Sequence, residues 1–181
     1  MEWNRKRILE WYINTWSWIF KCYKLKGQYY RHGKLEFEGE FLYSRKYNGK
    51  GYDEKGNIIY ELINGNGKVK EYNYNNEKLN FEGEYKDGNK NGKGKAYSRE
   101  GTLIYEGEYL NGKRNGKGKT YYNNGILQYE GVFFNGKRNG LGKLYYNNGK
   151  LKYDGEFENG KINGNGKQYN IDVKLLFKEK N

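Results

Sequence analysis

The sequence is poor in the residues on which most catalytic and metal sites depend. It has no proline, one cysteine (Cys22) and one histidine (His32). A single cysteine excludes an intrachain disulfide framework, which agrees with a reducing compartment and a cytoplasmic location. One histidine and one cysteine cannot supply an ordinary zinc or iron site, and no Cys–His or Ser–His constellation is present. We therefore predict no catalytic residue, no metal and no cofactor, and hence a protein that is not an enzyme.

Long apolar stretches are also missing from the sequence. No run reaches the roughly 18–20 apolar residues that a membrane-spanning helix needs. Hydrophobic residues make up 35% of the chain, which is too little for a thick two-layer core, whereas 21 Tyr, 8 Phe and 4 Trp are present. Burial must therefore depend on flat aromatic rings, many of them with a polar tip, rather than on aliphatic packing.

The charge of the chain is strongly basic, with a formal net charge of +12. Such a balance suggests an acidic partner, which could be nucleic acid, anionic lipid or an acidic protein. A competing explanation is codon usage in an AT-rich bacterial or phage genome, because the chain is rich in Lys and Asn and its one alanine is Ala96. Glycine codons are GC-rich, so the 27 glycines indicate a structural requirement.

Internal repeats are the strongest pattern in the chain. Four aromatic-acidic-Gly-x-aromatic segments follow one another at intervals of 24 residues, starting at Phe81, Tyr105, Tyr129 and Tyr153. Each is followed by Asn, Gly and Lys residues, then by Gly-x-Gly-Lys and tyrosine. Residues 37–41 open an earlier unit, residues 54–67 form a shortened one, and residues 27–35 match half a unit. The pattern predicts about six repeats.

Each repeat has two turn signals and two strand-like runs, which predicts a β-hairpin. The Asn-Asn-Gly turn at 123–125 offers residues that tolerate positive φ, and a second turn is expected at 111–116. Alternation places Tyr105 and Tyr109 on one face with Gly107 between them, so that a ring covers a neighbouring glycine. On the opposite face, glutamates are expected to pair with lysines such as Lys117 and Lys119 on adjacent strands.

The run YEGEYLNGKRNGKGKTYYNNG resembles the MORN repeat, whose name refers to membrane occupation and recognition. The 24-residue spacing and the run YYNNGKLKYDGEF are similar to the bacterial variant of YwqK-type, antitoxin-like proteins. The resemblance covers residues 27–170. It implies an all-β fold, an elongated single-layer antiparallel meander of hairpins, and a non-enzymatic interaction module. MORN arrays serve unrelated functions, so the resemblance does not identify a partner.

The two ends differ from the repeats and are expected to cap the open sheet. At 171–181, alternation from Ile171 to Phe177 predicts a closing strand followed by a charged tail. At 1–26, we predict a helix that is apolar over most of its circumference. It contains all the tryptophans, which are Trp3, Trp11, Trp16 and Trp18. This helix could cap the first hairpins, bind a partner or mediate homo-oligomer formation, or lie on a membrane surface.

Four local features suggest chemistry but fit a structural role better. Gly-Lys-Gly-Lys-Thr at 116–120 resembles a phosphate loop, but the glycine needed five positions before Gly118 is Lys113. Glu106 and Glu108 share a face, yet their counterparts recur in every unit of what should be an open sheet, which indicates a solvated ladder rather than paired catalytic carboxylates. His32 occupies a turn position, where histidine tolerates positive φ. Cys22 falls in the apolar helix and is expected to be buried.

Basic residues recur near the second turn and form the candidate binding edge. They are Lys90, Lys113, Arg114, Lys137, Arg138 and Lys161. With two strands per repeat, these groups should recur at about 10 Å along the sheet, although charged turns are often simply solvated. Three functions fit: a module that occludes or scaffolds a protein partner, as an antitoxin, immunity protein or phage-encoded inhibitor would; a peripheral membrane protein that binds anionic lipid; and a binder of nucleic acid or a nucleoprotein, which we rank last.

Overall fold

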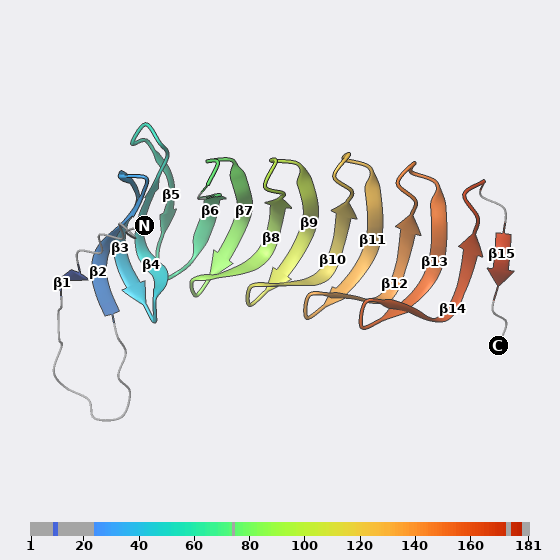
Figure 1. Ribbon diagram of the computed structural model, residues 1–181. Helices are drawn as coiled ribbons and strands as arrows, with labels where there is room; N and C mark the ends of the chain where they lie inside the picture. The colour runs from blue at the N-terminus through green and yellow to red at the C-terminus, as the bar shows by residue number, and fades with distance from the viewer. Residues whose placement is uncertain (1–8, 11–23, 74, 173–174, 179–181) are drawn as a thin grey trace, which may run out of the picture.

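The computed structural model describes residues 9–10, 24–73, 75–172 and 175–178. In this part of the chain all regular structure is β-strand, and within each sheet every strand pairs antiparallel with its neighbours in chain order. Figure 1 shows the strands arranged side by side in a long row from the N-terminal to the C-terminal end. The predicted antiparallel meander of hairpins is therefore confirmed.

The meander is divided into two sheets, of five and ten strands. The first contains β1 (Leu9–Glu10), β2 (Lys24–Arg31), β3 (Lys34–Leu42), β4 (Arg45–Tyr52) and β5 (Ile58–Leu62). The second contains β6 (Gly67–Tyr72), β7 (Leu79–Lys86), β8 (Asn89–Tyr97), β9 (Leu103–Leu110), β10 (Lys113–Tyr121), β11 (Leu127–Phe134), β12 (Lys137–Tyr145), β13 (Leu151–Glu158), β14 (Lys161–Tyr169) and β15 (Leu175–Lys178).

The division falls in the unit that the sequence marks as shortened. Strand β5 has five residues and β6 has six, whereas β9 and β10 have eight and nine. The connection between β5 and β6 keeps a single bridge, between Ile63 and Asn66. Five residues are too few to extend the hydrogen-bonded ladder to the full length of a regular repeat, so the sheet is interrupted there.

The tight hairpin turns are two residues long and use positive φ at both positions, as the strand twist requires. Asn111 and Gly112 have φ values of 49° and 83°. The turns that contain Gly88, Gly112, Gly136 and Gly160 also contact the preceding repeat; the Gly112 amide, for example, donates to the carbonyl of Lys90 at 2.8 Å. In the Asn-Asn-Gly turn only Gly125 has positive φ. His32 is in a tight turn at φ 47°, as predicted.

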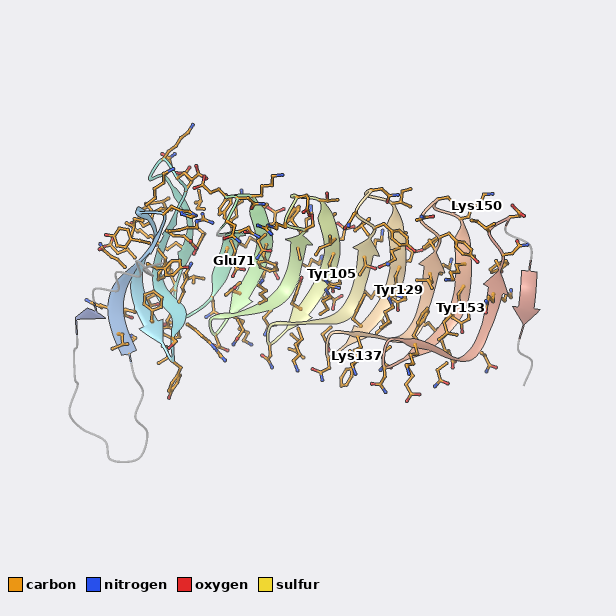
Figure 2. All side chains as sticks on the ribbon, in the orientation of Figure 1. Glu71, Tyr105, Tyr129, Lys137, Lys150 and Tyr153 are labelled. Carbon is orange, nitrogen blue, oxygen red and sulfur yellow. The ribbon has the colours of Figure 1, made fainter. Side chains whose placement is uncertain are left out.

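Most of the core is a ladder of aromatic rings on one face of the second sheet, and the core continues into the first sheet with Phe37, Tyr60 and Leu62. Successive rings meet edge to face, with centroids between 5.1 and 5.4 Å apart. In order of contact the ladder contains Phe81, Tyr109, Tyr105, Phe133, Tyr129, Phe157 and Tyr153. Figure 2 shows Tyr105, Tyr129 and Tyr153 at equivalent positions of successive repeats. Each repeat therefore supplies packing surface to the next.

Glycine pairs beneath these rings explain why the sequence retains so many glycines. Gly107 and Gly118 face each other on β9 and β10, and Tyr105 lies over both. The Tyr105 hydroxyl continues across the strand and donates to the carbonyl of Glu108 at 2.8 Å. The predicted packing of rings on glycines is present in the fold.

Gly118→Ala is expected to lower the free energy of unfolding by about 1–3 kcal/mol, the usual cost of overpacking. A Cβ atom at this position would lie 2.6 Å from the Tyr105 hydroxyl oxygen and 2.8 Å from its ring. Urea unfolding measures the loss, with Lys119→Ala as the control, since Lys119 is the exposed next residue. Equal stability of Gly118→Ala and the control would contradict the steric role of Gly118.

Two predictions about the chain ends need correction. Ile171 and Asp172 lie in a turn, and β15 starts only at Leu175, so the closing strand is shorter than expected. In the expected N-terminal helix, the structure describes Leu9 and Glu10 alone, and these form strand β1, paired with Gly27 and Lys26. The helix is thus not supported where it can be judged. Its remainder lies outside the described residues, as do Cys22 and the residues Trp3, Trp11, Trp16 and Trp18.

Candidate functional site

The face opposite to the aromatic ladder carries charged residues in two rows, with a row of glycines between them. Strand pairing defines the rows, because directly opposed residues lie on the same face. The first row contains Lys70, Glu82, Lys95, Glu106, Lys119, Glu130 and Lys143. The second contains Lys68, Glu84, Lys93, Glu108, Lys117, Val132 and Leu141. The glycines between the rows include Gly83, Gly94, Gly107, Gly118, Gly131 and Gly142.

These three rows line a groove with a volume of about 1170 Å³ that crosses the strands from β6 to β12. We call it the charged groove. It corrects the expectation of an open sheet without a pocket, on which the glutamates would form a merely solvated ladder. The groove lies across repeated units, so its chemistry repeats along its length instead of concentrating at one point.

The glutamates of the first row are held by tyrosine hydroxyls from the same repeat. Tyr97 donates to Glu82 at 2.7 Å, and Tyr145 donates to Glu130 at the same distance. Tyr121 donates to Glu106 in the same way. In the second row, the carboxylate of Glu84 accepts the backbone amide of Lys93 at 3.0 Å. These carboxylates are thus bonded within the fold.

The lysines of the first row are not engaged in this way. Lys119 lies opposite both Glu106 and Glu130, but no ion pair within 4.0 Å forms between them. Within the described residues the same is true of Lys95 and Lys143, and all three side chains are exposed. The predicted Glu–Lys ion pairs are therefore wrong for this row, because tyrosine hydroxyls bind the glutamates instead. Lys117 lies opposite Val132 and not opposite a glutamate on β11.

The tyrosine hydroxyls of this row are difficult to ionise. Burial, followed by the neighbouring glutamate, raises the pKa of Tyr97, Tyr121 and Tyr145 to about 12. The ordinary value is 10.0. Because the pKa is higher in the folded state, these groups stabilise the fold fully below about pH 10, and that contribution is lost as the pH rises towards 12.

Alkaline titration is therefore expected to reduce stability steeply between about pH 10 and 12. In the triple variant Tyr97→Phe, Tyr121→Phe, Tyr145→Phe the fall should be shallower, since three of the responsible groups no longer titrate. Urea midpoints measured at pH 8 and pH 11 for both proteins give the comparison. An equal decrease in urea midpoint in both proteins would show that ionisation of these hydroxyls does not contribute to the pH dependence of stability.

Three of the six predicted edge residues turn towards the aromatic ladder. Lys90, Arg114 and Arg138 place their charged groups 3.9, 4.5 and 4.8 Å from the ring centroids of Phe81, Tyr105 and Tyr129, respectively. Cations over ring faces stabilise a fold by about 0.5–2 kcal/mol each. Lys90 is also paired with Glu71 at 3.0 Å.

The other three edge residues lie on the face of the charged groove. Lys113, Lys137 and Lys161 are each the first residue of a strand and are exposed. Lys113 donates to the side-chain oxygen of Asn135 at 2.6 Å. Figure 2 shows Lys137 at the tight-turn edge and Lys150 at the opposite edge. The six residues thus follow one edge but divide between two faces, and their role in binding stays a prediction.

The lysines inside the groove, above all Lys95, Lys119 and Lys143, were missed as candidate binding residues. The signal that could have found them is the repeated Gly-x-Gly-Lys motif. Its lysine follows a glycine that faces the rings, so alternation sends the lysine to the other face. Taken alone, the same alternation predicts ion pairs between these lysines and glutamates rather than lysines that a ligand can reach.

No group of three or more His, Cys, Asp or Glu side chains is close enough to hold a metal ion in the part of the chain that the structure describes. A search of the same residues for a helix able to cross a membrane also finds none.

Comparison with protein families gives one match. The model of the MORN repeat matches residues 81–103, 105–126, 129–150 and 153–170, which are the four regular units described above. No curated protein matches the chain. MORN repeats generally mediate interactions with proteins or membranes and are typically non-enzymatic. The match to four successive units shows that residues 81–170 consist of MORN repeats.

Proposed function

We propose that the charged groove binds an extended acidic segment of a partner protein. The proposal depends on one observation: the acidic side chains of the first row are hydrogen-bonded within the fold, whereas the basic side chains of that row are not paired. The carboxylates of Glu82, Glu106 and Glu130 accept tyrosine hydroxyls, whereas the lysines beside them are exposed and form no ion pair within the described residues. Unpaired ammonium groups are therefore what the groove offers to a ligand.

The dimensions of the groove suit a peptide. It crosses seven strands, and neighbouring strands are about 4.8 Å apart, so its length is about 29 Å. An extended chain spans that distance with about nine residues. Lys95, Lys119 and Lys143 lie on every second strand, so their charges recur at about 10 Å. Acidic residues three positions apart on an extended ligand would match this spacing.

A protein segment fits the groove better than a uniform polyanion does. Glu108 is exposed between the lysines, and Glu84 also borders the groove. A nucleic-acid backbone or an anionic bilayer would meet these carboxylates with like charge, whereas a peptide can place polar residues there. The rings of Tyr105 and Tyr129 are fully buried, so they offer no surface on which bases could stack.

A fluorescein-labelled peptide with glutamate at every third position and glycine elsewhere tests the proposal by anisotropy. We expect saturable binding at one peptide per chain, with affinity that falls as salt rises. A single-stranded oligonucleotide and vesicles of mixed phosphatidylserine and phosphatidylcholine are measured in parallel. Absence of peptide binding, with saturable binding to either of these, would replace the proposal with the corresponding alternative.

Occlusion of the partner, as by an antitoxin, immunity protein or phage-encoded inhibitor, is the more specific form of the proposal. It is supported by the sequence resemblance and by the extent of the groove, which would cover a segment of partner chain. It predicts a stoichiometric complex that inhibits the partner. Recovery of an active partner at saturation would limit the protein to scaffolding.

A further inference from the structure

Four exposed apolar side chains interrupt the charged pattern on the groove face. The exposed fractions are 49% for Leu110, 36% for Val132, 64% for Phe134 and 67% for Leu141. They belong to β9, β11 and β12, with β10 lying between β9 and β11 in the sheet. We call them the apolar patch.

The register places the patch on the same face as the groove. Phe134 is opposite Lys137 and Leu110 is opposite Lys113, while Val132 is opposite Lys117. Val132 and Leu141 also line the groove itself. The patch is therefore continuous with the groove at the tight-turn edge, and lysines border it.

Equivalent positions in the other repeats are charged or polar. The residue equivalent to Val132 is Glu108 in the preceding unit and Glu156 in the following unit. The residue equivalent to Leu141 in the preceding unit is Lys117. Side chains as exposed as Phe134 and Leu141 contribute little to the packing of the fold. Grouped exposed apolar residues with a polar rim typically mark an interaction site.

We propose that the apolar patch receives one or two large apolar side chains of the acidic segment that occupies the groove. This inference rests on the proposed function and makes the partner more specific: an amphipathic segment in which acidic residues flank a bulky apolar residue. Apolar side chains buried in such patches usually contribute a large share of the binding free energy. The flanking charges fix the alignment of the peptide in its site and raise the association rate.

The charges around the patch favour a peptide over the other occupants. Exposed Glu108 and Glu156 border it, and an anionic membrane would be repelled by both. A second copy of the chain would bring a net charge of +12 against lysines such as Lys113 and Lys137. An acidic peptide with a central apolar residue satisfies the lysines and covers the patch.

Two fluorescein-labelled peptides test the inference on the full chain. One has glutamate at every third position and glycine elsewhere, and in the other two central glycines are replaced by Phe and Leu. We expect the second peptide to bind about tenfold more tightly, the gain that one buried anchor provides. In the double variant Leu110→Ser, Phe134→Ser, whose two positions lie in the patch but not in the groove lining, this gain should disappear while binding of the first peptide is unchanged. Ile63→Ser is the matched control, because Ile63 is 66% exposed and lies outside the patch.

The outcomes separate this inference from the proposed function. Equal binding of both peptides to the natural chain would contradict the proposed role of the apolar patch but would not affect the groove proposal. Failure of both peptides to bind overturns the groove proposal and the patch with it. The patch is also overturned if the double variant loses binding to phosphatidylserine vesicles instead of peptide, or loses a dimer that sedimentation shows in the natural chain.

Discussion

Replacing Tyr105 with alanine is expected to lower the free energy of unfolding by about 3–5 kcal/mol. The side chain is fully buried, and its ring packs edge to face on those of Tyr109 and Phe133. The ring centroids are 5.2 and 5.3 Å apart, respectively. It also covers Gly107 and Gly118. Its removal opens a gap between two repeats, and the glycine backbone on which the ring rested has no side chain with which to fill it.

Chemical denaturation followed by circular dichroism measures this loss. Tyr105→Phe should cost about 1 kcal/mol, since it removes only the hydrogen bond to the Glu108 carbonyl. Phe134→Ala serves as the exposed control and should change stability by less than about 0.5 kcal/mol. Similar losses at Tyr105 and Phe134 would show that the aromatic ladder does not hold the repeats together.

Reversing three groove charges, with Lys95→Glu, Lys119→Glu and Lys143→Glu combined, is expected to weaken binding of the glutamate-glycine peptide about a hundredfold. Each reversal replaces an attraction of about 0.5 kcal/mol, typical of an exposed pair, with a similar repulsion. The three reversals together therefore cost about 3 kcal/mol, and 1.4 kcal/mol corresponds to a tenfold change in affinity. All three side chains are exposed, so the fold should tolerate the changes.

A charge-matched variant separates the groove from net charge. Lys55→Glu, Arg99→Glu and Lys150→Glu combined change the net charge equally at exposed turn positions outside the groove lining. This control should lose only the part of the affinity that long-range attraction supplies, a few-fold at low salt. If both triple variants lose binding equally, the groove has no specific role and net charge explains the affinity.

The hairpins and their two faces could be predicted from the sequence because local rules determine them. The 24-residue spacing, the Asn111-Gly112 turn and the alternation around Gly107 each follow from backbone geometry over a few residues. The shortened unit at 54–67 was also visible, since it lacks residues that its neighbours have. Rings packed on glycines followed from the same alternation.

The unpaired lysines of the groove could not be predicted, because they depend on which neighbouring group hydrogen-bonds to each glutamate. Alternation correctly placed Lys119 beside Glu106, but the competing hydroxyl of Tyr121 binds that carboxylate. The division of the edge residues follows from alternation alone, because Lys113 and Arg114 are neighbours on β10 and lie on opposite faces, with Arg114 packed on Tyr105. The partner that each carboxylate binds, in contrast, depends on contacts between strands.

An NMR titration of the isotope-labelled chain with the glutamate-glycine peptide tests the central claim most directly, namely that one face of the repeat array holds the fold and the other binds an acidic partner. We expect chemical-shift changes at the amides of Lys95, Lys119 and Lys143, with the ring resonances of Tyr105 and Tyr129 unchanged. Chemical-shift changes confined to the aromatic face, around the rings and around Arg114 and Arg138 that pack on them, would contradict the claim.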